Sequence, residues 1–218
     1  MDGRAFVAQL IAENEKLLAK LNEEPLAASA AGATAQLAAL LKIALKNEME
    51  AAEIAASWVS TTPELDAKLA LARHAGDEAR HYELLAEQTV ALGISLDGFD
   101  PLHLPSPVLE YLRTLETTVE RIAAALVTRE AMGGRRNAQF LKFLEAVGQK
   151  ELARLYREVV NPDEERHHRA GCEVLARLAT TPETQQAARR AAAKLLEIGD
   201  RVRDTLLTRT GALVIPGC

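Results

Sequence analysis

Two short segments of the chain share one pattern of acidic, basic and imidazole side chains. Residues 77–81 read Asp-Glu-Ala-Arg-His and residues 163–167 read Asp-Glu-Glu-Arg-His, so both follow D-E-x-R-H. Helical residues three apart lie on one face, so the Glu and His of each copy can offer an oxygen and a nitrogen to one metal ion. A single E-x-x-H means little, but two copies with the same added Asp and Arg exceed chance and indicate an internal repeat. The pattern predicts one metal site shared by both segments.

Such a site requires one further glutamate from each of two neighbouring helices. Antiparallel helices joined by a short turn place residues opposite their mirror images through the turn. Glu48 mirrors Glu78 through a predicted turn at Pro63, and Glu130 mirrors Glu164 through the next predicted turn of this kind. The predicted ligands are Glu48, Glu78, His81, Glu130, Glu164 and His167.

The periodicity of the apolar residues supports this choice of glutamates. Glu48 and Glu130 each interrupt an apolar helical stripe, whereas Glu50 lies off the stripe of Glu48, and Glu116 and Glu120 lie on a polar face. Buried carboxylates are costly as unpaired ions, and neither Lys nor Arg accompanies these groups on their stripes. Metal cations are therefore the natural counter-charge, and a structural salt-bridge network is the competing interpretation.

The composition predicts an all-α protein. Only 4% of the residues are aromatic, Ala, Leu, Glu and Arg are abundant, and no alternating strand pattern lasts more than a few residues. Thr62, Ser106 and Thr181 each precede a proline, which is typical of a helix start. The expected helices span residues 3–22, 34–60, 63–92, 106–146, 149–179 and 182–208.

One long link, residues 93–105, separates two tightly connected helix pairs. This arrangement predicts an antiparallel four-helix bundle with one long crossover over about 34–179. The first and last helices are expected to be accessory helices that pack against the bundle or a second subunit. We expect a single domain over 1–218.

Charge and cysteine content exclude several classes of protein. The formal net charge is -5 and the pI is near 5.6, which argues against a nucleic-acid surface. Two cysteines are too few for a disulfide framework and fit a reducing compartment. Because the sequence has neither an apolar run long enough to span a membrane nor a signal-peptide pattern, we expect a cytoplasmic protein without a membrane partner.

With its doubled motif and two supporting glutamates, the chain resembles the ferritin-like superfamily of carboxylate-bridged di-iron proteins over about 34–179. D/E-E-x-R-H is most similar to the oxygen-activating branch, which includes bacterial multicomponent monooxygenases and acyl-carrier-protein desaturases. The resemblance implies two Fe ions, with Mn or a mixed pair as alternatives. It implies that Glu78 and Glu164 bridge the metals, that Glu48 and Glu130 are more terminal, and that His81 and His167 bind one metal each.

The resemblance also implies a layer of supporting residues and a set of reaction partners. Asp77 and Asp163 would orient the ligand histidines, and Arg80 and Arg166 would join the same network. The expected partners are O2, an unknown small or acyl substrate and an external electron donor, and the expected assembly is a monomer or homodimer. The chain is much shorter than the large monooxygenase subunits, so their substrate and reductase surfaces do not carry over.

Two other function classes stay open at this point. One is a rubrerythrin-like or ferritin-like protein for iron oxidation, iron handling or peroxide scavenging, although the chain has no rubredoxin-like cysteine cluster. The other is a metal-free helical interaction module that retains the bundle. Oligomeric size and metal content separate these classes from an oxygenase.

Several features near the motifs allow two interpretations. Pro162 precedes the second motif and the mirror rule places it near Gly133 and Gly134, which predicts either an open, kinked wall or close helix packing. His74 lies one turn before Glu78, where a packed or supporting histidine is favoured over an extra ligand. His168 belongs to a frame-shifted E-x-x-H and is expected to be peripheral.

Overall fold

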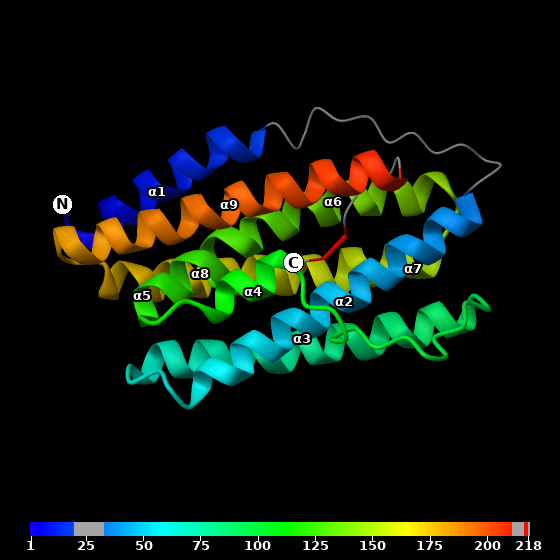
Figure 1. Ribbon diagram of the computed structural model, residues 1–218, viewed down its shortest axis with the longest axis horizontal. Coiled ribbons are helices and arrows are strands. Elements are labelled where there is room, and N and C mark those ends of the chain that lie inside the picture. Colours follow the sequence, from blue (N-terminus) through cyan, green and yellow to red (C-terminus); the bar gives the residue numbers. More distant parts are fainter. Residues whose placement is uncertain (20–32, 211–215, 218) are drawn as a thin grey trace.

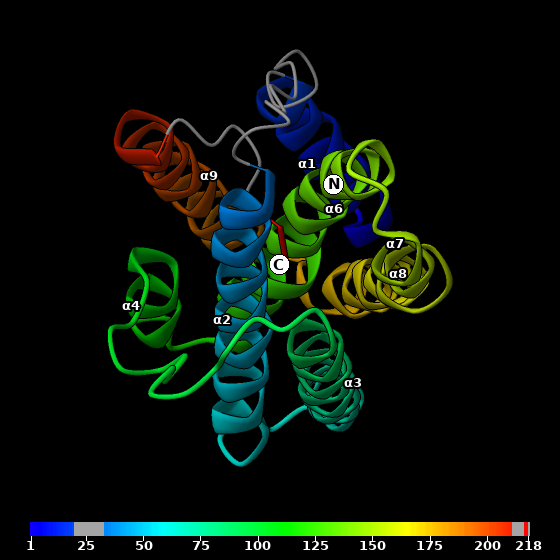
Figure 2. The ribbon, with the colours of Figure 1, turned by 90° about the vertical axis from the view of Figure 1, so that its right-hand side faces the viewer.

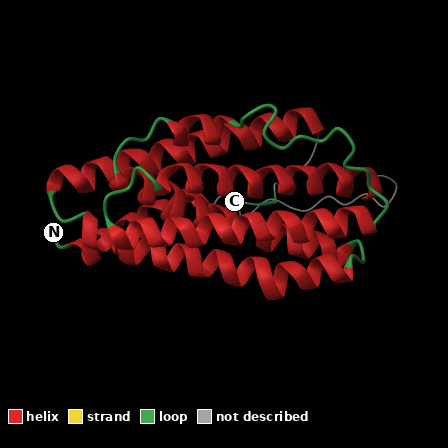
Figure 3. Ribbon diagram, turned by 90° about the horizontal axis from the view of Figure 1, so that it is seen from below, coloured by secondary structure: helices red, strands yellow, loops and turns green. Residues whose placement is uncertain are grey.

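The computed structural model describes residues 1–19, 33–210 and 216–217. All regular secondary structure in these residues is helical, which confirms the predicted all-α class (Figure 3). Within the described part of the chain, no helix combines the length and apolar character needed to cross a membrane.

The first predicted helix pair is present. Helices α2 (Ala33–Val59) and α3 (Leu65–Ala91) pack side by side as a hairpin, within two residues of the expected ends at the shared turn (Figure 1). Thr62 differs from its predicted role as a helix start, because its hydroxyl donates to the Trp58 carbonyl at 2.8 Å and so caps the end of α2.

The predicted helix 106–146 is interrupted. It comprises α4 (Pro107–Arg113), α5 (Thr118–Arg121), the π-helical segment η2 (Ile122–Arg129) and α6 (Glu130–Ala146). Ser106 caps α4 as expected, but Thr117 and Glu120 form a reciprocal capping box that starts a second helix. Because a capping box satisfies the backbone donors of a new first turn, the chain restarts there.

The predicted helix 149–179 follows one helical path through Pro162. It comprises α7 (Lys150–Leu155), the π-helical segment η3 (Tyr156–Val160) and α8 (Asn161–Leu178). Proline has no N–H to donate within the helix, and the wider π-helical turns directly before it accommodate that loss. The π-helical segments end at Arg129, directly before Glu130, and at Val160, four residues before Glu164.

Two outer helices cover the molecule on the side away from α3. Helices α1 (Gly3–Leu18) and α9 (Pro182–Thr210) both contact η2 and each other, and α1 also contacts α8 (Figure 2). Phe6 and Leu10 of α1 are buried, whereas Leu17 is exposed. The outer helices thus pack against the inner helices of their own chain, which was one of the two predicted arrangements. Residues 20–22 of the predicted first helix lie outside the described residues.

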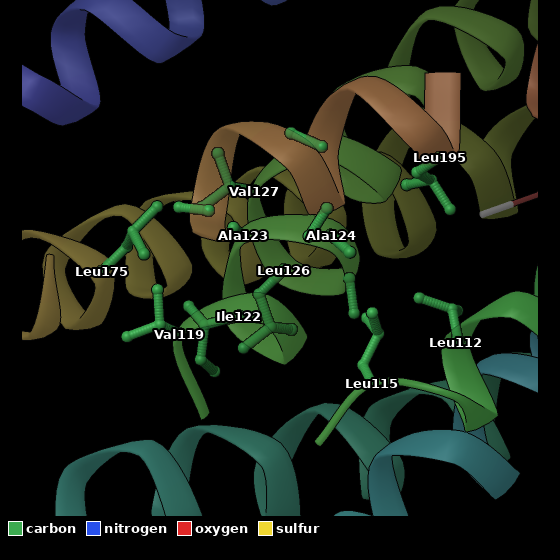
Figure 4. Packing of buried hydrophobic residues seen from close by; sticks show 14 of the residues in the cluster. Leu112, Leu115, Val119, Ile122, Ala123, Ala124, Leu126, Val127, Leu175 and Leu195 are labelled. Carbon is green, nitrogen blue, oxygen red and sulfur yellow. The ribbon is translucent and has the colours of Figure 1, made fainter. Parts of the chain in front are cut away.

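The η2 segment is buried along its whole length (Figure 4). Its small residues, Ala123–Ala125, allow neighbouring helices to approach closely, and Gly171 of α8 faces it. A Cβ atom on Gly171 would lie 2.8 Å from the backbone of Leu126, so only glycine fits this contact.

The apolar core is divided into two large clusters. One contains Leu71, Leu126 and Val174, and the other contains Leu41 and Phe140. On α2, α3 and α8 the predicted ligands lie between residues of the two clusters, and Glu130 follows η2 and precedes Phe140 in the same way. The fold therefore places a polar layer between two apolar ones.

Candidate metal centre

The structure brings all six predicted ligands together in this polar layer, with His74 as a seventh residue. The side chains form two groups, and within each group one potential ligand atom per residue lies within 4.8 Å of the others. The first group is His74, Glu78, Glu130 and His167, and the second is Glu48, Glu78, His81 and Glu164. All seven residues are buried.

The first group is rich in imidazole. His74 Nε2 lies 3.0 Å from Glu130 Oε1 and 3.2 Å from Glu78 Oε1. His167 Nδ1 lies 3.2 Å from Glu78 Oε1 and 3.6 Å from Glu130 Oε2. Two nitrogens and two carboxylates therefore face a common point.

The second group is rich in carboxylate. His81 Nδ1 lies 3.5 Å from Glu48 Oε2, 3.6 Å from Glu78 Oε2 and 4.0 Å from Glu164 Oε1. Glu78 thus directs Oε1 toward the first group and Oε2 toward the second. This is the position expected for a bridging carboxylate. Glu164 belongs to only one of the two groups, so the bridging role predicted for Glu164 stays a prediction.

The acidic residues of the two motifs hold the histidines crosswise. His81 Nε2 of α3 lies 3.1 Å from Asp163 Oδ2 of α8, and His167 Nε2 of α8 lies 3.0 Å from Asp77 Oδ2 of α3. When each Nε2 carries the proton and donates it to the Asp, each Nδ1 is left with a lone pair aimed at the carboxylates. This fixes the tautomer that can bind a metal ion.

The two motif arginines contribute unequally. Arg166 donates to Asp163 Oδ1 at 2.5 Å and to Asp77 Oδ2 at 3.0 Å, so it joins both Asp–His pairs. Arg80 Nη1 lies 3.8 Å from Asp163 Oδ2, beyond hydrogen-bond distance, although both arginine side chains are about equally exposed. We conclude that Arg166 is the stronger support of the two.

The carboxylates and imidazoles strongly perturb one another. Burial raises the pKa of Glu48 to about 8, and the neighbouring Glu78 carboxylate adds to the rise. Burial would also raise the pKa of Glu78, but the close imidazoles of His167, His74 and His81 outweigh it and hold this pKa well below its ordinary value.

The histidines respond in the opposite sense. Burial would lower the pKa of His81, but Glu48 and Glu78 raise it to about 11. Glu130 and Glu78 likewise raise the pKa of His167 to about 10 against the effect of burial. Without a metal ion, protons on these imidazoles therefore supply the positive charge that balances the buried carboxylates.

The hydrogen-bonding pattern fits a metal better than a salt-bridge network. Among the residues that the structure describes, both carboxylate oxygens of Glu48 and of Glu78 are buried without a hydrogen-bond partner of good geometry, as are His81 Nδ1 and His167 Nδ1. Buried polar atoms of this kind are normally satisfied, so a convergent set of orphaned acceptors needs another partner. Carboxylate oxygens and imidazole nitrogens together suit Fe, Mn or Zn.

His74 is the residue that the sequence interpretation undervalues. The sequence favours a packed histidine at this position, yet its Nε2 faces Glu78 and Glu130 as a ligand would. The spacing His74, Glu78, His81 places all three on one face of α3 and was the available signal. Unlike His81 and His167, His74 has no hydrogen-bond partner at its other nitrogen, Nδ1, within the described part of the chain.

Two of the glutamates that the sequence analysis does not choose as ligands, Glu50 and Glu120, have structural roles. Glu50 is buried, but it accepts from the Ser106 backbone N–H at 2.7 Å and pairs with Lys46 at 2.8 Å, so it anchors the start of α4. Glu120 completes the capping box of α5. His168 lies outside both groups and contacts the Val127 carbonyl through Nδ1 at 2.9 Å, as expected for a peripheral residue.

A cavity of about 450 Å³ reaches the centre between α6 and α8. Its lining includes the ligand candidates Glu130 and Glu164 together with Gly134 and Asn161. A Cβ atom on Gly134 would meet nothing within 4 Å, so this glycine leaves open space. At Gly134 the open-wall interpretation of the sequence therefore describes the structure better than close packing does.

Residues Pro216 and Gly217 approach the centre from another side, which the sequence does not indicate. Asn47 donates to the Pro216 carbonyl at 2.7 Å, and the Gly217 N–H donates to Asn137 Oδ1 at 2.7 Å. Gly217 has φ +89° and leaves no room for a side chain, because a Cβ atom would lie 2.8 Å from Asn47 Cβ and 3.3 Å from Glu48 Oε1. This segment therefore packs directly against one predicted ligand.

No family model matches the chain, and comparison with curated proteins and solved structures returns no significant match. The functional interpretation accordingly rests on the geometry of the two groups.

Proposed function

We propose that the protein is a ferritin-like non-haem di-iron oxidase or oxygenase that activates O2 at the seven-residue centre. The observation that carries this proposal is Glu78, whose two oxygens face two separate sets of ligands within one buried layer. A bridging carboxylate between two metal positions is the defining element of such sites in helix bundles. When bound, a pair of iron ions would supply the electrons that reduce O2.

The chain's own residues have distinct roles in this proposal. Glu48, Glu130 and Glu164 would hold the metals with Glu78, and the three histidines would complete the two coordination sets. Asp77 and Asp163 keep the ring nitrogens of His167 and His81 oriented, which preserves geometry when carboxylates shift. The apolar clusters on either side exclude water from the layer.

The cavity beside Glu130 and Glu164 favours an oxygenase over a protein that oxidises only iron. It provides about 450 Å³ next to the proposed metals, within the size range of small-molecule sites. A small organic substrate would enter between α6 and α8, where Gly134 leaves space. An external electron donor would be needed to reduce the metals before each turnover.

Stopped-flow mixing tests the proposal. Protein loaded anaerobically with two ferrous ions per chain is mixed with O2, and we expect a transient visible absorbance. If excess ferrous iron is then oxidised well beyond the loaded amount, and the protein elutes as a large shell, the alternative of iron handling is correct. Metal-loaded protein without any transient or O2 consumption would contradict oxygen activation.

A further inference from the structure

Two residues that belong to no helix lie inside the molecule. Pro216 and Gly217 are both buried, and Figure 2 shows their red trace beside α2 and α6, in the middle of the helices. Buried backbone N–H and C=O groups need hydrogen-bond partners, and this pair has no regular secondary structure to supply them. Side chains must therefore hold the pair in the interior.

Two asparagines from different helices provide these partners. Asn47 of α2 donates from Nδ2 to the Pro216 carbonyl, and the Gly217 N–H donates to Oδ1 of Asn137 on α6, each at 2.7 Å. Asn137 is fully buried, and the backbone carbonyl of Asn47 accepts from the buried Arg129 at 3.1 Å. The pair is thus fixed between α2 and α6 by interior hydrogen bonds, whose loss would leave buried groups unsatisfied.

Gly217 fits closely against Glu48, a candidate ligand of the carboxylate-rich group. Its φ of +89° suits glycine, and a Cβ atom at this position would lie 3.3 Å from Glu48 Oε1. The other oxygen of Glu48, Oε2, lies 3.5 Å from His81 Nδ1. One oxygen of Glu48 therefore faces a ligand histidine and the other faces Gly217, and this close packing restricts the rotation of the carboxylate.

The metal centre is accessible at other ligands. The cavity of about 450 Å³ between α6 and α8 is lined by Glu130 and Glu164, and Glu48 does not occur among the described residues of its lining. Ions and small molecules can therefore approach the centre at Glu130 and Glu164. At Glu48, by contrast, the buried pair occupies the space next to the carboxylate.

We propose that Pro216 and Gly217 form a seal on the carboxylate-rich metal position, which keeps Glu48 in place as a ligand and slows the loss of that ion. Asn47 and Asn137 are positioning residues, because they bind the seal and not the metal. The imidazole-rich group does not contain Glu48, so its ion should not depend on the seal. The proposal rests on the two metal positions of the proposed function but not on oxygen activation.

The rate of zinc release from the full-length chain tests the proposal. Zinc has no redox chemistry and binds carboxylate and imidazole ligands, so the result does not depend on a reaction with O2. Protein loaded with two zinc ions per chain is mixed with an excess of a chromophoric chelator, and we expect two kinetic phases, one for each position. Glu48→Gln should accelerate the phase of the carboxylate-rich position and so identify it.

Asn137→Leu removes the acceptor of the Gly217 N–H and keeps a side chain of similar size. We expect release in the identified phase to be roughly tenfold faster or more, because an unpaired buried donor favours opening of the seal, and the other phase to be unchanged. Asn14→Leu is the matched control, since Asn14 is also buried and donates to Thr128 Oγ1 at 3.0 Å. This control should leave the identified phase unchanged.

If Asn137→Leu does not fold, two glycines provide the comparison. Gly217→Ala and Gly148→Ala both place alanine at a positive φ, of +89° and +75°. A Cβ atom on Gly148, between α6 and α7, would meet nothing within 4 Å, so only Gly217→Ala should accelerate the identified phase. Circular dichroism confirms that each variant folds.

The possible outcomes separate the seal from the metal centre. Equal acceleration of both phases in Asn137→Leu, unchanged release in this variant, or equal effects of the two glycine substitutions would overturn the seal and leave the two-metal centre in place. A chain that retains no zinc would contradict the metal centre and the seal together.

Discussion

Asp77 of α3 holds the ring of His167 of α8, with 3.0 Å between Oδ2 and Nε2. Asp163 of α8 holds His81 of α3 in the same way at 3.1 Å. Each copy of the motif therefore supplies the carboxylate that orients the histidine of the other copy. Neither copy is complete alone, which explains in physical terms why the Asp accompanies the Glu and His in both.

Replacing Asp77 by Asn should weaken metal binding by about 10- to 100-fold, because the amide does not fix the tautomer of His167. Competition with a chelator of known affinity measures the loss. Asp66→Asn is the matched control, because Asp66 also lies on α3 and pairs with Arg177 of α8 outside the centre. A similar loss in both variants would show that any contact between α3 and α8 has this effect.

His74→Ala should weaken one of the two metal positions, because His74 belongs only to the group with Glu130 and His167. Elemental analysis after dialysis is expected to give close to one ion per chain for this variant. His168→Ala, on α8 and outside both groups, should retain the full content. Full metal content in His74→Ala would return His74 to the role of a packed histidine.

The metal-free protein should lose stability as the pH rises from about 6 to about 9. The pKa values of His81 and His167 are raised to about 11 and about 10, so their stabilising protonation is complete below 6.5 and is lost as the pH rises through these values. The pKa of Glu48 is raised from 4.5 to about 8, so Glu48 also makes the folded protein less stable as the pH rises from 4.5 to about 8. The reason is that the buried carboxyl group gives up its proton less readily than it does in the unfolded chain.

Metal ions should remove this pH dependence, since they replace the protons as counter-charge. Thermal melts of chelator-treated and metal-loaded protein across the same pH range provide the measurement. A metal-free protein whose melting temperature is constant or increases over this range would contradict the account of the charge balance.

Gly171→Ala should destabilise the fold by roughly 1–3 kcal/mol, because the added methyl group meets the backbone of Leu126. Gly76→Ala, in the exposed interior of α3 where a Cβ meets nothing within 4 Å, should stabilise by about 0.5–1 kcal/mol. Urea unfolding of both variants measures the difference. Equal effects would mean that α8 does not pack as closely on η2 as described.

The sequence predicts the convergence of the ligands well, since each signal is local or follows from a short turn. Helical periodicity places Glu48 and Glu130 on inward stripes, and the mirror rule pairs them with Glu78 and Glu164 across the hairpins. These predictions depend only on helix geometry and short connections, so they hold without knowledge of how the helix pairs pack.

The features that the sequence misses depend on packing between distant segments. The predicted helix 106–146 is interrupted before Thr117 because Thr117 and Glu120 form a capping box there, although the apolar pattern of the sequence continues through this position. The position of Gly217 against Glu48 joins residues 169 apart, and no local pattern encodes it. The role of His74 is intermediate, because its spacing is visible but its orientation depends on Glu130 from another helix.

Metal stoichiometry of the Glu78→Gln variant tests the central claim most directly. Purified protein is incubated anaerobically with ferrous iron, desalted and analysed for iron per chain, with Glu50→Gln as a buried control outside both groups. The account predicts two ions per chain in the unchanged protein and in Glu50→Gln, and loss of both ions in Glu78→Gln, because Glu78 is the one residue common to both groups. Iron content in Glu78→Gln equal to that of the unchanged protein, or absence of bound iron in both, would contradict a shared two-metal centre.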